Sequence, residues 1–459
     1  MTKEIVARLK KIVGKEYVMD KLEDRICYSF DATFRDSCPD VVVKPANTEE
    51  IVKVLQLAHQ HGIPVTAMGA ATGNSGGAVP LGKGICLGLT RLNRILKIDV
   101  ENRMAIVEPG VITDDFANAV LRTGLLFYPP DPASSKISTI GGNIVECAGG
   151  PRGVKYGITR DYVLGLEVVL SDGRVVEVGN QVDGDMCGPD WTMLFVGSEG
   201  TLGIVTKMFL RLAERPEAKQ TILAVYDRLD DAANTVSTII KSGTIPTTLE
   251  IMDNQTIRVV EDYLKAGLPV EADAVLLIEV DGSKVEVERQ KEHVINVCRK
   301  CGASDVQVAV TNEDIDRLWL ARRSISPACG KVSPTKFAED TTVPRSKVPE
   351  MLRKAREIAD KHGIKMLLFG HAGDGNLHPN IMTDRHNHAE MEKVELAVKD
   401  LFRAALELGG TLSGEHGIGY MKAPFLKWEL GEVGFEAGQK VKAALDPAHL
   451  LNPGKMFTA

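Results

Sequence analysis

Long apolar runs are missing from this chain of 459 residues, since no window holds the 18 or more apolar residues that a membrane-spanning helix needs. The first residues, MTKEIVARLKKIVGKE, are charged throughout and contain no apolar secretion core. The eight cysteines are scattered, without the four-cysteine run of an iron–sulfur protein. We therefore expect a cytoplasmic protein whose thiols stay reduced, including the one close pair, Cys298 and Cys301, in a helix-like stretch.

A large excess of one charge and the common nucleotide-binding motifs are also missing. The net charge of −7 argues against broad, non-specific binding of nucleic acid. Neither the GxGxxG pattern nor the Gly-Lys-Ser/Thr of a P-loop is present. With 44% hydrophobic and 25% charged residues the composition is that of a globular protein, and the length suggests two or three domains.

Hydrophobic periodicity predicts a β-rich α+β region over residues 1–215. One helix is expected from Thr48, which can cap it, to Gly62, a stop signal. Strands Val163–Leu170 and Arg174–Val178 are expected to form a hairpin. Further helices are expected at 2–13 and 113–124, and further strands at 41–43, 63–67, 85–89, 95–100 and 105–111.

Beyond about residue 220, strands alternate with long helices, which is typical of a sheet covered by helices on one side. The whole chain is therefore expected to be α+β. The strands expected here are 221–226, 247–252, 274–280 and 365–369, and the helices are 229–242, 254–266, 283–301, 350–362 and 389–408.

Glycine is concentrated in a sixth of the chain, where five windows hold 26 of the 43 glycines. Glycine lets backbone N–H groups turn toward a phosphate. The second window overlaps a long, weakly periodic stretch, residues 130–150, that we expect to be a functional loop. The first three windows together predict a large ligand held mostly by backbone groups, and a dinucleotide fits. The windows are 69–88, 141–165, 197–203, 363–375 and 409–419.

Histidine is uneven too, since seven of the ten histidines lie in the last hundred residues. Gly373 and Gly375 permit a tight turn that could bring His371 and His378 to one side. With Glu415 they make a plausible ligand set for zinc or another divalent ion. A single histidine is more often a hydrogen-bonded structural residue than a metal ligand, and the spacing lacks the helical HExxH geometry.

Besides the glycine windows and the histidines, the chain contains four specific motifs. They are Lys155–Asp161, Gly370–His378, Ser413–Gly419 and Asn452–Lys455. With the glycine windows they resemble, over almost the whole chain, the FAD-binding D-2-hydroxyacid dehydrogenases of the vanillyl-alcohol oxidase superfamily. The resemblance implies an FAD-binding domain of the p-cresol methylhydroxylase (PCMH) type, with two subdomains. It would span residues 1–215 and be completed by the tail, 420–459. Residues 216–419 would form an α+β substrate (cap) domain with an antiparallel sheet and the metal site.

The resemblance also implies which residues hold FAD, and FAD would be bound non-covalently because the first glycine loop contains no histidine. Relatives often read Arg-Gly-x-Gly-Thr where this chain has Met68–Thr72, so its two alanines could alter flavin affinity. The cofactor-binding residues implied are Gly69, Ala70, Ala71, Thr72, Gly73, Ser138, Thr139, Gly142, Asn143, Glu146, Ala148, Gly149, Glu199, Gly200, Ile204, Val205 and Asn452.

By the same resemblance His371, His378 and Glu415 would be the metal ligands, with zinc expected and manganese or iron as alternatives. His416 would be the catalytic base, which suits a neutral imidazole.

The substrate carboxylate also requires a cation. By the resemblance Arg322 would bind it with its guanidinium fork and take part in catalysis, with Ser326 and Asn380 as further substrate contacts. For Arg323 a solvated position on the same helix remains open. Lys336 could bind a second carboxylate or simply be exposed.

The activity implied is oxidation of a D-2-hydroxy acid, of the D-lactate, glycolate or D-2-hydroxyglutarate class, to the 2-oxo acid, with hydride passing to flavin N5. Electrons would then pass to an iron–sulfur subunit, an electron-transferring flavoprotein or quinone, and such a partner could hold the protein at a membrane. The alternatives are an oxidase of the same fold that acts on another alcohol with O₂, a metal-dependent hydrolase without flavin, and a non-catalytic FAD subunit. Whether the protein is a homodimer is left open.

Overall fold

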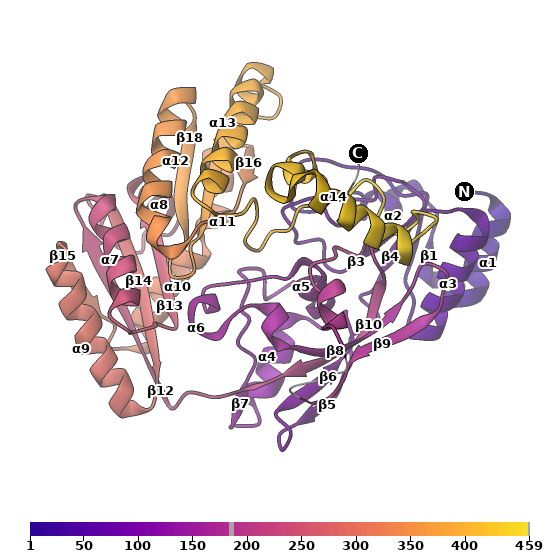
Figure 1. Cartoon of the computed structure of the whole chain (residues 1–459), viewed down its shortest axis with the longest axis horizontal. Coiled ribbons are helices and arrows are strands. Elements are labelled where there is room, and N and C mark those ends of the chain that lie inside the picture. Colours follow the sequence, from indigo (N-terminus) through magenta and orange to yellow (C-terminus); the bar gives the residue numbers. More distant parts are fainter. Residues whose placement is uncertain (183–187, 458–459) are drawn as a thin grey trace. The chain divides into compact units, whose positions relative to one another are not determined.

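The computed structural model describes residues 1–182 and 188–457, so Cys187 lies outside the described residues. The chain folds into two compact units. Unit 1 comprises Met1–Ala148, Ile158–Arg215 and Glu415–Ala459, and unit 2 comprises Gly149–Gly157 and Pro216–Gly414. In Figure 1 most of unit 1 is drawn from indigo to magenta with the tail in yellow, and most of unit 2 in pink and orange.

Unit 1 contains, among its described residues, a four-stranded sheet in the order β1-β2-β4-β3 and a five-stranded sheet in the order β5-β6-β10-β8-β9. Strands β2, β4 and β3 run parallel, whereas the second sheet is antiparallel throughout. A short pair, β7 and β11, stands apart. The strands are β1 (Val18–Met19), β2 (Val41–Val43), β3 (Val65–Met68), β4 (Ile85–Gly88), β5 (Ile95–Asp99), β6 (Met104–Val107), β7 (Leu126–Phe127), β8 (Val163–Val169), β9 (Val175–Gly179), β10 (Ile204–Arg211) and β11 (Ala213–Glu214).

The predicted helix at Thr48 is present as α3, but Asn47 caps it instead of Thr48. The Asn47 side chain accepts a hydrogen bond from the Glu50 N–H at 2.9 Å, because Asn47 has extended backbone and Thr48 already lies in the first turn. The helices of unit 1 are α1 (Lys3–Val13), α2 (Leu22–Ile26), α3 (Thr48–His61), α4 (Thr113–Leu121), α5 (Ile140–Glu146) and α14 (Leu426–Leu445).

The stretch 130–150, which we expected to be a loop, contains helix α5, so this expectation was wrong. Thr139 caps the helix by accepting a hydrogen bond from the Gly142 N–H at 3.3 Å. Ile140 and Ile144 are fully buried in the core of unit 1. Two adjacent glycines lower the helix propensity of this segment, and tertiary burial outweighs that cost.

Unit 2 is built on an antiparallel sheet, eight-stranded within the described residues. Its main path is β15-β12-β14-β13-β18-β19-β16, and β17 pairs with β19 away from this path. The strands are β12 (Ala218–Tyr226), β13 (Thr248–Asp253), β14 (Ala274–Gly282), β15 (Ala303–Val308), β16 (Thr335–Ala338), β17 (Thr341–Thr342), β18 (Lys365–His371) and β19 (Asn376–Thr383).

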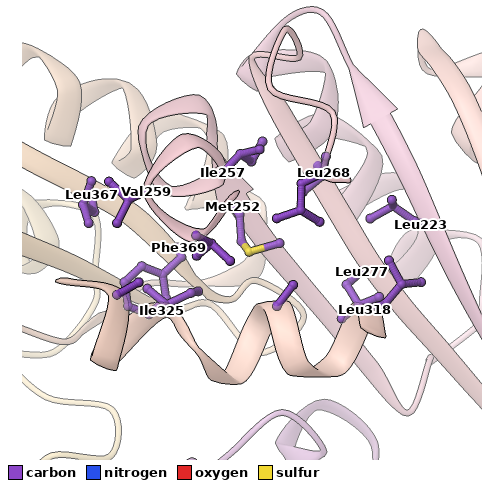
Figure 2. Packing of buried hydrophobic residues seen from close by; sticks show 14 of the residues in the cluster. Leu223, Met252, Ile257, Val259, Leu268, Leu277, Leu318, Ile325, Leu367 and Phe369 are labelled. Carbon is purple, nitrogen blue, oxygen red and sulfur yellow. The ribbon is translucent and has the colours of Figure 1, made fainter. Parts of the chain in front are cut away.

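Helices cover both faces of this sheet, not one face as we expected. On one face Leu223, Met252 and Phe369 pack in a core with residues of α8, α10 and α11 (Figure 2). Residues of opposite parity, such as Ile251 and Ile278, are equally buried, and α7, α9 and α12 contact these strands too. The helices are α6 (Gly153–Tyr156), α7 (Leu229–Lys241), α8 (Asn254–Leu264), α9 (Lys284–Lys300), α10 (Asn312–Arg323), α11 (Ile325–Val332), α12 (Val348–His362) and α13 (His388–Glu407).

The face that carries α8, α10 and α11 is apolar at one end and polar at the other. Because side chains alternate along a strand, Glu250 lies on the same face as Met252, and His371 lies on the same face as Phe369. Leu318 and Ile325, on either side of Arg322 in sequence, are buried in the core of this face (Figure 2). Packing at the apolar end of the face therefore fixes the positions of the strands and of the helix that carry the polar side chains.

Candidate functional site

The two histidines of the Gly370–His378 motif lie on one hairpin of unit 2. β18 pairs with β19 in antiparallel register, and Phe369 lies opposite His378. The rings of His371 and His378 are 5.0 Å apart, edge to face, and both side chains are buried. Gly375 has a φ of +90°, and a Cβ there would lie 2.1 Å from the Val343 carbonyl oxygen, so the turn requires glycine. The tight turn expected from the glycines is present.

Glu415 follows directly on a loop that is tied to unit 2. The side chain of Asp340 accepts hydrogen bonds from the Ser413 hydroxyl at 3.0 Å and from the Gly414 N–H at 2.7 Å. The ligand atoms of His371, His378 and Glu415 all lie within 4.8 Å of one another. Two imidazole nitrogens and a carboxylate oxygen at this spacing suit zinc, manganese or iron, with positions left for substrate or water.

Glu250 is a residue of this cluster that the sequence analysis missed. Its Oε1 lies 2.7 Å from His371 Nδ1 and its Oε2 2.6 Å from Arg322 Nε, and all three side chains are buried. Burial alone would raise the pKa of Glu250, but the charges of Arg322 and His371 and the hydrogen bonds to them hold it below its usual value. The sequence did contain a signal, a carboxylate between the apolar residues Leu249 and Ile251 in the strand Thr248–Asp253.

The other predicted substrate residues lie on neighbouring elements of unit 2. Asn380, on β19, is buried and stands opposite Ala338 of β16. The Lys336 Nζ donates a hydrogen bond to the exposed Ser326 hydroxyl at 2.8 Å. Lys336 is half-buried, and burial lowers its pKa. Arg323 is exposed on α10, with its guanidinium 5.4 Å from the centre of the Trp319 ring.

The first glycine loop of unit 1 lies against the start of α5. A Cβ on Gly69 would come within 2.4 Å of Thr139 Oγ1, so the loop can approach the cap of the helix only with glycine at this position. Ser138 and Asn143 are held by Thr113, at 2.9 Å and 2.8 Å. These hydrogen bonds fix the positions of both side chains.

The remaining predicted cofactor residues follow the loops that surround this region. Ala70, Ala71, Thr72 and Gly73 continue the loop after β3, and Ala71 has a φ of +54°. Gly142 and Glu146 lie on α5, Ala148 ends the first segment of unit 1, and Gly149 opens the short segment that belongs to unit 2. Glu199 and Gly200 precede β10, which begins with Ile204 and Val205.

Two carboxylates, the buried Glu199 and the half-buried Glu146, lie beside the C-terminal part of the chain in unit 1. Glu199 accepts hydrogen bonds from the N–H groups of Ile418 and Gly419, both at 2.6 Å. Burial and then the charge of Glu199 raise the pKa of Glu146. The Asn452 side chain donates to the carbonyl oxygens of Gly77, at 2.8 Å, and Glu199, at 2.7 Å.

Polar atoms are left over in this region. Oε2 of Glu146 and Oδ1 of Asn452 are buried without a hydrogen-bond partner among the described residues. Buried polar atoms normally have partners, so these two are suited to a polar ligand. The loops and the unpaired atoms together fit a dinucleotide cofactor.

His416 lies in unit 1, and its Nε2 is 3.4 Å from the Asn74 side-chain nitrogen. Asn74 follows Gly73 in the first glycine loop. The loop of the predicted cofactor residues and the predicted base therefore belong to one unit.

Family models match most of the chain. Residues 215–456 match the family described as FAD linked oxidases, C-terminal domain, and residues 39–179 match the FAD binding domain. The chain belongs to the FAD-linked oxidases. Its cofactor is FAD, and the FAD-linked oxidase described here is an oxidoreductase of the glycolate oxidase and D-lactate dehydrogenase type, as the resemblance predicted.

Relatives of this FAD-linked oxidase match all or nearly all of its length. The glycolate oxidase subunit GlcD of Bacillus subtilis is 50% identical over 458 residues, which are 100% of this chain and 97% of that protein. The D-lactate dehydrogenase of Archaeoglobus fulgidus is 37% identical over 91% of both chains.

The fold is shared more widely. The structure of p-cresol methylhydroxylase with substrate bound superimposes with a TM-score of 0.81 at 18% identity, covering 99% of this chain and 96% of that one. The predicted α+β fold, a PCMH-type FAD-binding domain with a cap domain, is thus confirmed. Among the described residues, no helix is long and apolar enough to cross a membrane.

Proposed function

We propose that this FAD-linked oxidase is a metal-dependent dehydrogenase that oxidises a short D-2-hydroxy acid to the 2-oxo acid. The observation that carries the proposal is the convergence of the His371, His378 and Glu415 ligand atoms within 4.8 Å. A 2-hydroxy acid offers a carboxylate and a hydroxyl oxygen that can chelate a divalent ion. The names of relatives, a glycolate oxidase subunit and D-lactate dehydrogenases, support this substrate class.

Each side chain then has a task. Arg322 binds the substrate carboxylate through its terminal nitrogens, since its Nε is engaged by Glu250. Asn380 and Ser326 hold the substrate from neighbouring elements. The half-buried Lys336 near them would meet a second carboxylate, which would extend the substrate range to D-2-hydroxyglutarate.

The reaction removes one proton and one hydride from the substrate. His416 removes the proton of the 2-hydroxyl as a general base, which typically contributes about 10²–10⁴-fold to the rate. His371, His378 and Glu415 would hold a divalent metal, which would lower the pKa of that hydroxyl. FAD bound in unit 1 would supply the acceptor for the hydride equivalent from C2.

Unit 1 would hold FAD through the predicted residues of its glycine loops, of α5 and of the tail, largely by backbone groups. Unit 2 would be the substrate domain. The electrons would leave to an iron–sulfur subunit, an electron-transferring flavoprotein or quinone, and the printed name of the Bacillus subtilis relative, a subunit, supports a protein partner.

The test is anaerobic titration of the purified protein. It should show a flavin absorption band that D-lactate, glycolate or D-2-hydroxyglutarate bleaches. A protein without a flavin band would contradict the cofactor assignment. A flavin that none of the three acids reduces, even with Zn²⁺, Mn²⁺ or Fe²⁺ added, would contradict the substrate class. Release of H₂O₂ on turnover in air would favour the oxidase alternative.

The metal site is tested by His371→Ala. The variant should keep its flavin band, lose bound metal and lose flavin reduction by substrate. His386→Ala is the control, because His386 is an exposed residue of the same unit and should leave all three unchanged. Full activity in His371→Ala would show that the ligand assignment is wrong.

A further inference from the structure

Glu250 is a charged side chain in the middle of an interior strand, where an apolar residue is the rule. β13 lies between β14 and β18, and Glu250 pairs with Leu277 on one side and with His371 on the other. Its side chain is 0% exposed. Removing a carboxylate from water is costly unless partners offset the lost hydration, and an apolar residue at this position would avoid that cost. This charge therefore calls for a role in the site.

Each oxygen of Glu250 has its own nitrogen partner. Oε1 lies 2.7 Å from His371 Nδ1, and Oε2 lies 2.6 Å from Arg322 Nε. Because an ionised carboxylate only accepts hydrogen bonds, Nδ1 must carry the hydrogen, and Nε2 of His371 then keeps its lone pair. Arg322 is held through Nε. Because the guanidinium group is planar, this bond also fixes the direction in which its two terminal nitrogens point.

We propose that Glu250 is a positioning residue that links the metal ligand to the substrate clamp. Through one carboxylate it fixes the tautomer of His371 and the orientation of Arg322. The proposal rests on the proposed function, in which these two residues have different tasks. Removing Glu250 should thus weaken both metal binding and substrate binding, although Glu250 itself would contact neither the metal nor the substrate.

The test uses the FAD-loaded protein and Glu250→Gln, which keeps the size of the side chain but can accept from only one of the two partners. We expect the dissociation constant for Zn²⁺, measured by competition with a chelator, to rise about 10–100-fold, as is typical for the loss of a carboxylate behind a metal-ligating histidine. At saturating metal, KM for the substrate should also rise about 10-fold or more, because an uncharged amide no longer forms the ion pair that holds Arg322. The flavin band should remain.

Glu279 provides a matched control in the same sheet. It is a buried carboxylate on β14, the strand next to β13, and its partners are Thr221 at 3.0 Å, Trp319 at 3.3 Å and Lys219 at 3.3 Å. Glu279→Gln should change the metal affinity and KM by less than about threefold. This separates a specific role of Glu250 from the general cost of removing a buried charge.

Glu250→Asp gives a second measurement if the glutamine variant fails to fold. Aspartate keeps the charge but is one methylene shorter, so it should restore at most one of the two affinities. Wild-type metal affinity and wild-type KM in either Glu250 variant would overturn the proposal while leaving the proposed function intact. A wild-type protein that binds no divalent metal would overturn both.

Discussion

At the residue scale, Asp253 is a buried carboxylate whose pKa the fold raises. Burial raises its pKa to about 6, against the hydrogen bonds from Thr256 and the charge of Arg356, which lower it. Between about pH 4 and 6 the folded protein keeps a proton that the unfolded chain has lost. The free energy of unfolding therefore falls as the pH rises through this window.

Asp253→Asn should remove this dependence. Asparagine can still cap α8 through its side-chain oxygen, as Asp253 does toward the Thr256 N–H at 2.9 Å. From pH 4 to pH 7 the unfolding free energy of the variant should rise, relative to that of the wild type, by roughly 2 kcal/mol. Urea unfolding at several pH values measures it. A difference that does not change with pH would contradict the assignment.

Two side chains in the predicted FAD-binding segments take part in hydrogen bonds within the fold. Ser138 and Asn143 were predicted to hold FAD, yet the side chains of both bond to Thr113. These bonds use one amide hydrogen of Asn143 and the hydroxyl of Ser138, so part of each side chain serves the fold. Sequence motifs identify such a segment, but they do not tell which of its atoms remain available.

At the element scale, the β18–β19 hairpin brings His371 and His378 together. Gly375→Ala would place a Cβ 2.1 Å from the Val343 carbonyl oxygen at a φ of +90°. We expect the variant to lose more than about 2 kcal/mol of stability in unit 2 and most of its metal affinity, while FAD binding is kept.

Gly330→Ala is the control for this change. Gly330 lies in α11, and nothing lies within 4 Å of the Cβ it would gain. This substitution should be neutral or stabilise the protein by up to about 1 kcal/mol, because alanine favours a helix over glycine. Thermal unfolding and metal titration of both variants give the comparison. Equal metal affinity in the two would show that the turn does not set the ligand geometry.

At the scale of the whole molecule, the end of the chain completes the unit in which it began. Leu451 bridges Val65 of β3, and the Asn452 N–H donates to the Val65 carbonyl oxygen at 2.8 Å. The Lys455 Nζ donates to the carbonyl oxygens of Gly76, at 2.5 Å, and Val79, at 2.7 Å. These bonds tie the tail to the first glycine loop.

A chain that ends at His449 should therefore lose the stability of unit 1. Burial of Leu450 and Leu451 alone is worth roughly 3–6 kcal/mol, and the loop would lose its hydrogen bonds to the tail. We expect FAD to be lost and unit 1 to be cut readily by protease, while unit 2 resists. Mass spectrometry of the fragments measures this. Retention of FAD would contradict the role given to the tail.

Local sequence patterns predicted the limits of a helix or strand correctly where the periodicity of the segment agrees with its tertiary environment. Strand β13 and helix α12 appear within two residues of their predicted limits, and the glycines of the histidine hairpin correctly indicated a tight turn. Prediction failed where tertiary contacts outweigh local preference. Helix α5, with its two glycines, is one case, and the second covered face of the unit 2 sheet is another.

What the sequence determined by itself is the inventory: the α+β pattern, the glycine loops and the histidine and carboxylate motifs, because each is written in neighbouring residues. Only the tertiary structure decided which of these distant residues come together in one site. Glu250, Arg322 and His371 are separated by 72 and 121 residues along the chain, counted from Glu250. Strand pairing and helix packing bring them within hydrogen-bonding distance, because a buried carboxylate is stable only where its partners surround it.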